Sequence, residues 1–312
     1  MQSLSELEQL KKYTTVVGDT GDIDEIARVK PAEATTNPSL ILKAARQEKY
    51  RDVIAEAKRA ASSPQDRTDR LLVGFGSRIL EHIPGRVSTE VDARLSFDAD
   101  ATVRRARNII ALYESLGIDR ARILIKIAAT WEGCRACRIL EDEGIHCNMT
   151  LIFELAQAEA SAQAGATLIS PFVGRIYDWF KAAEGSCWDE VANSGPRDPG
   201  VQSVTEIFRR LKGAGSATQI MGASFRNKGE ILALAGCDLL TIAPKFMDEL
   251  AGSFSTVPRS LDAGAIPEGA PIRIAEPDFR YRMNRSEIAT VKLSEGIRAF
   301  VADTERLEGM LL

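Results

Sequence analysis

The chain alternates short apolar runs rich in β-branched residues with longer stretches of helical periodicity. Eight of the runs have the length and composition of buried strands: residues 13–18, 33–37, 86–91, 122–128, 146–151, 167–173, 218–223 and 238–243. Amphipathic helical stretches separate them, among them residues 98–116, 131–143, 153–164, 201–213 and 226–235. This alternation over about 250 residues predicts an α/β fold, a (β/α)8 TIM barrel, with a doubly wound sheet as the competing fold.

No Pro/Gly-rich linker or low-complexity segment divides the chain into halves. Residues 184–199 and 254–277 are irregular enough to be long surface loops, whereas residues 1–12 and 286–312 are helical. We therefore expect residues 1–312 to form a single (β/α)8 barrel domain with additional terminal helices. The C-terminal helix is expected to pack across the exterior or the mouth of the barrel.

The charge and hydropathy of the chain argue against a nucleic-acid-binding protein and against a membrane protein. The net charge of −4 and the pI near 5.5 provide no basic surface for nucleic acid. No stretch is long enough to span a membrane, and the N-terminus lacks the apolar core of a signal peptide, so we expect no membrane partner and a cytoplasmic location.

The cysteines and histidines argue against a metal site. Five scattered cysteines are typical of free thiols in a reducing compartment. Cys134 and Cys137 are spaced as Cys-x-x-Cys, but they lie in a helical stretch and no second pair follows at zinc spacing. With only two histidines, imidazole metal sites and Ser-His-Asp catalysis are nearly excluded.

Lys126 interrupts the apolar run at residues 122–128, which otherwise has the composition of a strand buried on both faces. Burial disfavours the charged form of an amine, so an interior lysine is a candidate nucleophile that forms a Schiff base with a carbonyl carbon. The alternative is a core lysine that pairs with a carboxylate.

Polar residues collect where the predicted strands end, which is where barrel enzymes carry their catalytic groups. Besides Lys126 they are Asp19, Asn37, Glu90, Asn148, Thr150, Ser170, Ser224 and Arg226. We expect them to converge on one pocket.

Each of these residues also has a purely structural interpretation. Asp19 could cap a turn, Glu90 could pair with an arginine, and Asn37 could cap the helix that starts at Pro38. Asn148 and Thr150 could be ordinary polar strand residues. Packing is the simpler role for Phe172, although it would also fit beside a sugar.

A phosphate site is predicted after the sixth and seventh strands. Ser224 and Arg226 lie between a strand and a helix, where barrels hold phosphate with backbone N–H groups, a hydroxyl and a cation. Arg175 follows the preceding strand and is adjacent by topology. Two arginines and a serine suit a phosphate dianion, although surface salt bridges are the ordinary alternative.

Six segments together resemble the transaldolase family, with little interruption between residue 13 and about residue 248. They are residues 13–22 (YTTVVGDTGD), 34–40 (ATTNPSL), 84–94 (PGRVSTEVDAR), 123–128 (ILIKIA), 169–175 (ISPFVGR) and 221–227 (MGASFRN). The resemblance implies a class I, Schiff-base-forming (β/α)8 enzyme that acts on sugar phosphates, needs no metal or cofactor and is usually a homodimer. Ala129 departs from the family, where many members have serine, and residues 254–286 match nothing in it.

The resemblance also implies residue roles. Lys126 would form the Schiff base, Asp19 would act as acid and base on the C4 hydroxyl, and Glu90 with Thr150 would handle the catalytic water. The remaining residues would bind substrate: Asn37, Asn148, Ser170 and Phe172 around the sugar, and Arg175, Ser224 and Arg226 at the phosphate.

The competing functions are a fructose 6-phosphate aldolase-like cleavage and a phosphosugar-binding barrel without catalysis. The first is disfavoured by the length of the chain and by Glu90. The second is disfavoured because Asp19, Glu90 and Lys126 occur together. No residues suggest a partner for the ring of pyridoxal phosphate.

Overall fold

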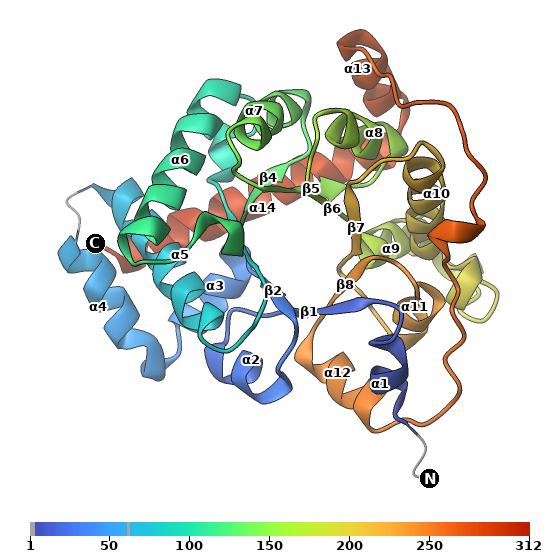
Figure 1. The fold of residues 1–312 in the computed structure, drawn as a ribbon, viewed down its shortest axis with the longest axis horizontal. Coiled ribbons are helices and arrows are strands. Elements are labelled where there is room, and N and C mark those ends of the chain that lie inside the picture. The colour runs from blue at the N-terminus through green and yellow to red at the C-terminus, as the bar shows by residue number, and fades with distance from the viewer. Residues whose placement is uncertain (1–3, 61–62) are drawn as a thin grey trace.

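The strands close into a barrel. In the computed structural model, which describes residues 4–60 and 63–312, eight parallel strands pair in chain order and the last pairs with the first (Figure 1). The strands are β1 (Thr15–Asp19), β2 (Glu33–Thr35), β3 (Val87–Glu90), β4 (Ile123–Ala128), β5 (Cys147–Ile152), β6 (Leu168–Pro171), β7 (Gln219–Gly222) and β8 (Leu239–Ile242). The predicted (β/α)8 barrel is therefore confirmed, and the doubly wound alternative is wrong.

Helices surround this barrel (Figure 1). They are α1 (Glu6–Leu10), α2 (Ile23–Val29), α3 (Pro38–Ala45), α4 (Arg51–Ala60), α5 (Pro64–Leu80), α6 (Ala99–Ser115), α7 (Trp131–Asp142), α8 (Leu155–Gln163), α9 (Val173–Glu184), α10 (Pro199–Gly213), α11 (Lys228–Ala233), α12 (Pro244–Ala251), α13 (Glu276–Arg285) and α14 (Glu287–Met310). The predicted helices are confirmed with their ends shifted by a few residues. Of the predicted N-terminal helix, residues 1–3 lie outside the described part of the chain.

Capping side chains explain where several helices begin. Thr130 Oγ1 accepts the N–H of Gly133 (2.8 Å) at the start of α7, and Asp98 Oδ1 accepts that of Ala101 (2.8 Å) at the start of α6. Such a cap contributes about 1 kcal/mol by satisfying an N–H that has no partner within the helix. These caps also fix where each strand-to-helix turn ends, and hence where the residues of the turn point.

The interior of the barrel is filled in layers. At the amino ends of the strands, the Arg86 guanidinium binds Glu33 (2.7 Å) and Gln219 (2.9 Å). Above them lies a separate apolar cluster of Val17, Leu124, Leu168, Met221 and Leu239. Side chains two positions apart on a strand face the same side, so Asp19 and Lys126 lie one layer further up. The apolar layer separates the polar carboxyl end of the barrel from its base.

Helix α14 crosses the carboxyl ends of the strands, behind the barrel in the view of Figure 1. It packs against α3, α5, α9 and β5. Phe300 of this helix is 1% exposed, and the centroid of its ring lies 5.9 Å from Lys126 Nζ. Of the two placements expected for the C-terminal helix, the mouth is therefore the observed one.

Within residues 4–60 and 63–312, no helix combines the length and the apolarity that crossing a bilayer requires.

Candidate active site

Strands β3, β4 and β5 bring the central candidates side by side. In the parallel register Glu90 lies opposite Lys126, and Lys126 lies opposite Asn148. Thr150 follows two positions along β5, after which Leu151 adopts a left-handed conformation (φ 57°) and the pairing with β6 shifts. The strand is therefore irregular just after Thr150, and irregularities of this kind, such as β-bulges, commonly redirect side chains beside active sites.

Lys126 is buried, at 5% exposure, and its amine has two close oxygen neighbours. Its Nζ lies 3.2 Å from Glu90 Oε2 and donates a hydrogen bond to the Thr36 carbonyl (3.3 Å). The Glu90 contact is an ion pair without hydrogen-bond alignment, because Glu90 Oε2 has no hydrogen-bond partner in the described part of the chain. A carboxylate at this distance can take a proton from the amine and so generate the nucleophile.

Glu90 and Thr150 each place a buried polar atom at this level of the barrel. Within the described residues, both Glu90 Oε2 and Thr150 Oγ1 are buried without a hydrogen-bond partner. Burial raises the pKa of Glu90, and the nearby Lys126 opposes this shift. Buried polar atoms normally have partners, so an unsatisfied carboxylate and hydroxyl suit a site where water or substrate is handled.

Asp19 ends β1 on the same side of the barrel and is half-buried. The Thr35 hydroxyl lies 3.3 Å from Asp19 Oδ1, where it can donate a hydrogen bond, and 2.8 Å from the Thr241 hydroxyl. Burial raises the pKa of Asp19, whereas the charge of Lys126 and the Thr35 contact lower it. Asp19 therefore interacts electrostatically with the candidate nucleophile without pairing with it directly, as an acid and base for another substrate atom would.

Asn148 and Ser170 belong to one hydrogen-bonded chain. Asn148 Nδ2 donates to Ser88 Oγ (3.0 Å), and the Ser170 hydroxyl donates to Asn148 Oδ1 (2.6 Å). Asn37 has a different role, because its Oδ1 accepts the N–H of Leu40 (2.8 Å) and caps α3. The capping interpretation of Asn37 is thus observed, and this contact leaves its side-chain amide nitrogen free for another role.

Phe172 and Arg175 form the side of the mouth beneath α14. The Arg175 guanidinium carbon lies 4.7 Å from the centroid of the Phe172 ring and 5.8 Å from that of Phe300. Burial lowers the pKa of Arg175, and the neighbouring charge of Arg226 lowers it further. Arg175 is half-buried and Arg226 is exposed, and an anion placed between these two mutually repelling cations stabilises both.

The loop after β7 carries Ser224 and Arg226. Ser224 adopts a left-handed conformation (φ 64°), and its carbonyl accepts the N–H of Gly174 (2.9 Å). A Cβ on Gly174 would lie 2.2 Å from that carbonyl oxygen, so only glycine permits this approach of the two loops. Arg226 is held by Asp178 of α9, with Nη2 2.6 Å from Asp178 Oδ2, and its Nη1 lies 3.2 Å from Ser224 Oγ.

Sequence reasoning missed two residues of this region, Phe300 and Asp178. Phe300 belongs to an amphipathic helix distant in sequence, and nothing in the helical pattern distinguishes a residue over the mouth from one over the exterior. Asp178 follows Arg175 by three positions on the same helix, which is the one signal that could have pointed to it.

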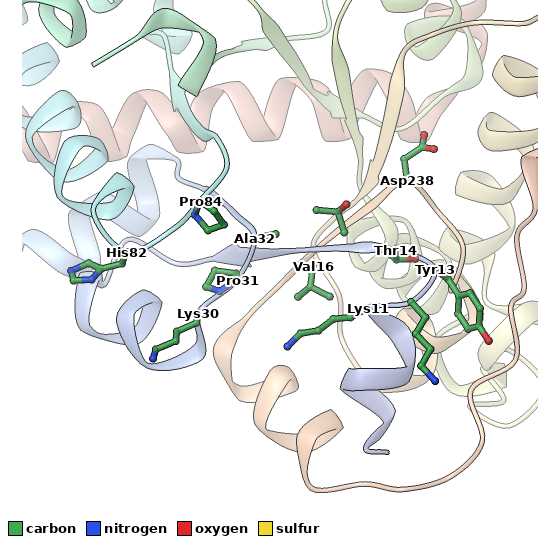
Figure 2. Close-up of a pocket in the computed structure, with 12 residues that line it drawn as sticks. Lys11, Tyr13, Thr14, Val16, Lys30, Pro31, Ala32, His82, Pro84 and Asp238 are labelled. Carbon is green, nitrogen blue, oxygen red and sulfur yellow. The ribbon is translucent and has the colours of Figure 1, made fainter. Parts of the chain in front are cut away.

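A large hollow of about 780 Å³ lies at the other end of the barrel (Figure 2). Its lining includes Tyr13, Lys30, His82 and Asp238, which precede β1, β2, β3 and β8 respectively. Residues before the strands lie at the amino end, which in this architecture serves stability, so the hollow is not part of the active site.

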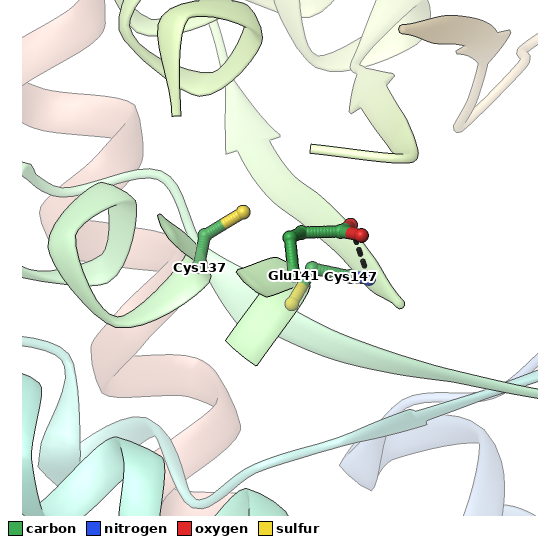
Figure 3. Close-up of side chains that lie close together, drawn as sticks. All are labelled: Cys137, Glu141 and Cys147. Carbon is green, nitrogen blue, oxygen red and sulfur yellow. Dashed lines mark hydrogen bonds between the residues drawn. The ribbon is translucent and has the colours of Figure 1, made fainter. Parts of the chain in front are cut away.

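The cysteines give little support for a metal centre. Burial raises the pKa of Cys134 to about 12. Cys137, Glu141 and Cys147 have possible ligand atoms within 4.8 Å of one another (Figure 3). However, Glu141 Oε1 already accepts the N–H groups of Cys147 (2.8 Å) and Thr167 (2.7 Å). The Glu141 carboxylate thus links the start of β5 to the start of β6 through hydrogen bonds, which is a structural function.

Comparison with known proteins agrees with this geometry. A family model described as Transaldolase/Fructose-6-phosphate aldolase matches residues 16–311, which include every candidate site residue. The chain is also similar to a curated protein of Methylibium petroleiphilum named transaldolase, with 56% identity over 311 residues that make up 98% of each chain.

Proposed function

Because the chain belongs to the transaldolase/fructose-6-phosphate aldolase family, we propose that Lys126 forms the covalent intermediate of its reaction. The activity is that of a transaldolase, a transferase of the pentose phosphate pathway that acts on sugar phosphates. A dihydroxyacetone unit passes from a ketose phosphate, such as sedoheptulose 7-phosphate or fructose 6-phosphate, to an aldose phosphate, such as glyceraldehyde 3-phosphate or erythrose 4-phosphate. The observation that carries the assignment is the buried Lys126–Glu90 pair.

The first half of the reaction forms the Schiff base. Glu90 removes a proton from Lys126, and the neutral amine attacks the C2 carbonyl of the ketose to give a carbinolamine. Protonation of the C2 hydroxyl through a water held by Glu90 and Thr150 lets that hydroxyl leave as water, which produces the iminium. The raised pKa of Glu90, caused by burial, suits a group that both accepts and returns protons.

The second half breaks and remakes a carbon–carbon bond. Asp19 takes the proton of the C4 hydroxyl, the C3–C4 electron pair moves into the iminium, and the aldose phosphate leaves while an enamine stays on Lys126. The acceptor aldehyde is then attacked by the enamine carbon, and Asp19 returns the proton to the new alkoxide. Water finally hydrolyses the iminium with the help of Glu90.

Transfer requires the enamine to survive until the acceptor arrives. Phe300 lies 5.9 Å from Lys126 Nζ, and Phe172 packs edge-on against Phe153 on the side wall. These apolar rings limit the access of water to the enamine, and they favour transfer over the simple cleavage of an aldolase. The ratio of transfer product to free dihydroxyacetone distinguishes the two activities.

Arg175, Ser224 and Arg226 bind the substrate phosphate in this proposal. Asn148, Ser170, Phe172 and Asn37 surround the sugar, the last through the amide nitrogen that its cap leaves free. The support for the phosphate site is the closeness of two cations at the mouth and the hydroxyl of Ser224 beside one of them.

The test is reductive trapping. Incubation with fructose 6-phosphate and borohydride should label one peptide, the one that contains Lys126. Lys126→Met should abolish the label while circular dichroism shows an intact fold. A label that persists in the folded variant assigns the Schiff base to another lysine.

We further propose that residues 1–312 act as one domain in a cytoplasmic homodimer. The family resemblance supports the homodimer, and the free thiols of all five cysteines support a reducing compartment. Light scattering after size-exclusion chromatography tests the dimer, since a single species of monomer mass would contradict it.

A further inference from the structure

Behind the candidate phosphate loop lie two buried carboxyl groups that the reaction does not use. Asp198 precedes α10 and is 1% exposed, and Glu230 on α11 is fully buried. Each carboxyl group shifts the pKa of the other: hydrogen bonding from Glu230 lowers the pKa of Asp198, and the charge of Asp198 raises the pKa of Glu230. Within the described residues, Asp198 Oδ2 is buried and has no hydrogen-bond partner.

The other oxygens of this pair all accept hydrogen bonds, and one of these comes from a side chain, because Asn227 Nδ2 donates to Glu230 Oε1 (3.2 Å). Asp198 Oδ1 accepts the N–H groups of Gly200 (2.7 Å) and Val201 (3.1 Å), which caps α10. Glu230 Oε2 accepts the N–H of Arg226 (2.7 Å), the residue that bears one of the two candidate phosphate-binding guanidinium groups. A change at Glu230 is therefore transmitted directly to the backbone of the phosphate loop.

Two ionised carboxylates in contact and away from water are unfavourable, because they repel each other and neither can donate a hydrogen bond. One proton resolves both problems, since it removes a charge and supplies the donor that Asp198 Oδ2 lacks. Burial is the main cause that raises the pKa of Glu230 to about 7; the hydrogen bond from the Arg226 N–H opposes this rise, and the charge of Asp198 contributes to it. Burial likewise raises the pKa of Asp198.

We propose that Asp198 and Glu230 share one proton and act as positioning residues that keep the loop around Ser224 and Arg226 competent to bind phosphate. This inference rests on the proposed phosphate site. Loss of the proton places a second negative charge directly behind an anion-binding loop and breaks the contact between α11 and the start of α10. Phosphate affinity should therefore fall as the pH rises through about 7.

The other charges near the pair are accounted for. Arg226 favours ionisation of Glu230, and Asp178 of α9 opposes it while pairing with Arg226. Charged groups on the packed elements have other partners: Arg197 the Val191 carbonyl, Lys228 the Glu6 carboxylate, and Asp248 of α12 the Arg28 guanidinium. The shared proton is thus carried by a group beside this loop whose pKa lies near 7.

Glu230→Gln is the informative variant, because its amide keeps an acceptor for the Arg226 N–H and provides a permanent donor for Asp198. Inorganic phosphate affinity, measured by calorimetry between pH 6 and pH 8.5, should weaken about three- to tenfold more in the wild type than in Glu230→Gln. Ionisation of phosphate itself affects both proteins equally. KM for fructose 6-phosphate should likewise rise more with pH in the wild type than in Glu230→Gln, while kcat changes little. Glu230→Leu, which can neither donate nor accept a hydrogen bond, should raise KM at every pH.

Urea unfolding provides a readout independent of phosphate. Glu230 is ionised in the unfolded chain above its ordinary pKa of 4.5 but protonated in the folded chain up to about 7. Folding then takes up a proton in this window, so the wild type should lose stability relative to Glu230→Gln as the pH rises from 4.5 to 7. Identical pH profiles of stability in the two proteins would overturn the shared proton.

A second outcome separates this inference from the phosphate site itself. If the stability profiles differ but phosphate affinity responds to pH equally in both proteins, the link to phosphate binding is overturned. If Arg226→Ala and Arg175→Ala also leave phosphate affinity unchanged, the proposed phosphate site has failed, whatever the state of the proton.

Discussion

The pairing of Arg226 with Asp178 makes a sharp test of the phosphate site. The guanidinium is engaged on two sides, since Nη2 lies 2.6 Å from Asp178 Oδ2 and Nη1 donates to the Ser224 carbonyl (3.0 Å). A substrate phosphate must therefore compete with Asp178 for this cation. Asp178→Asn removes the competing charge while it keeps the shape of the side chain.

The expected change in KM follows from how exposed the Arg226 and Asp178 side chains are. The Arg226 and Asp178 side chains are 37% and 48% exposed, so water screens their attraction and the pair contributes about 0.5–1 kcal/mol. Asp178→Asn should lower KM for phosphorylated ketoses by about two- to fivefold. Arg226→Ala removes a charge-assisted contact of at most about 1.5–3 kcal/mol, and at this exposure we expect the lower end, a KM raised about tenfold.

Steady-state kinetics with fructose 6-phosphate and with fructose provide the assay. Both variants should change KM for the phosphorylated sugar much more than for fructose, because only the former presents the anion. In the double variant, Asp178→Asn should have no effect, since the guanidinium for which Asp178 competes with phosphate is gone. Equal effects on both sugars, or an Asp178→Asn effect that persists without Arg226, would refute the reasoning.

Four further substitutions address the mechanism and the fold. Asp19→Ala should still form the Schiff base that borohydride traps, yet fail to cleave the ketose, whereas Glu90→Gln should slow the formation and the hydrolysis of the Schiff base. Single-turnover trapping that shows both variants blocked at the same step would contradict this division of roles. Phe300→Leu should increase the yield of free dihydroxyacetone relative to transfer product, and an unchanged ratio would remove Phe300 from the protection of the enamine. Arg86→Ala leaves the Glu33 carboxylate, which is 14% exposed, without its guanidinium partner, and should lower the free energy of unfolding in urea by about 3 kcal/mol. KM should not change, because the pair lies at the base of the barrel; a changed KM would show that the base is coupled to the mouth.

The barrel could be predicted because its strands are buried on both faces. Parallel strands covered by helices give continuous apolar runs, which differ clearly from the periodicity of the helices between them. Lys126 was identifiable for the same reason, since a charge in such a run requires a special environment. The strand ends could be predicted less well, because propensity changes gradually where hydrogen bonding stops abruptly.

The remainder of the site depends on contacts between distant segments. Nothing in the residues around Phe300 indicates that its helix crosses the mouth, and nothing around Asp198 indicates that Glu230 lies beside it. Asn37 was ambiguous because its side chain suits both a helix cap and a sugar hydroxyl, and only three-dimensional geometry revealed the cap. Sequence patterns report which face of an element is buried, but not which partner covers it.

Closure of the ring has a consequence for how the protein folds. Thr15 pairs with Leu239, so the hydrogen bonds that join β1 to β8 connect opposite ends of the barrel sequence. Such a contact carries a large loop-closure entropy and is expected late in folding. The Thr35 hydroxyl, shared between Asp19 and Thr241, lies beside this junction. A chain in which β1 and β8 are not yet paired would present both strands as open edges that are prone to aggregation. It would also lack the contacts that surround Asp19. Recovery of activity on refolding should therefore follow the pairing of β8 with β1.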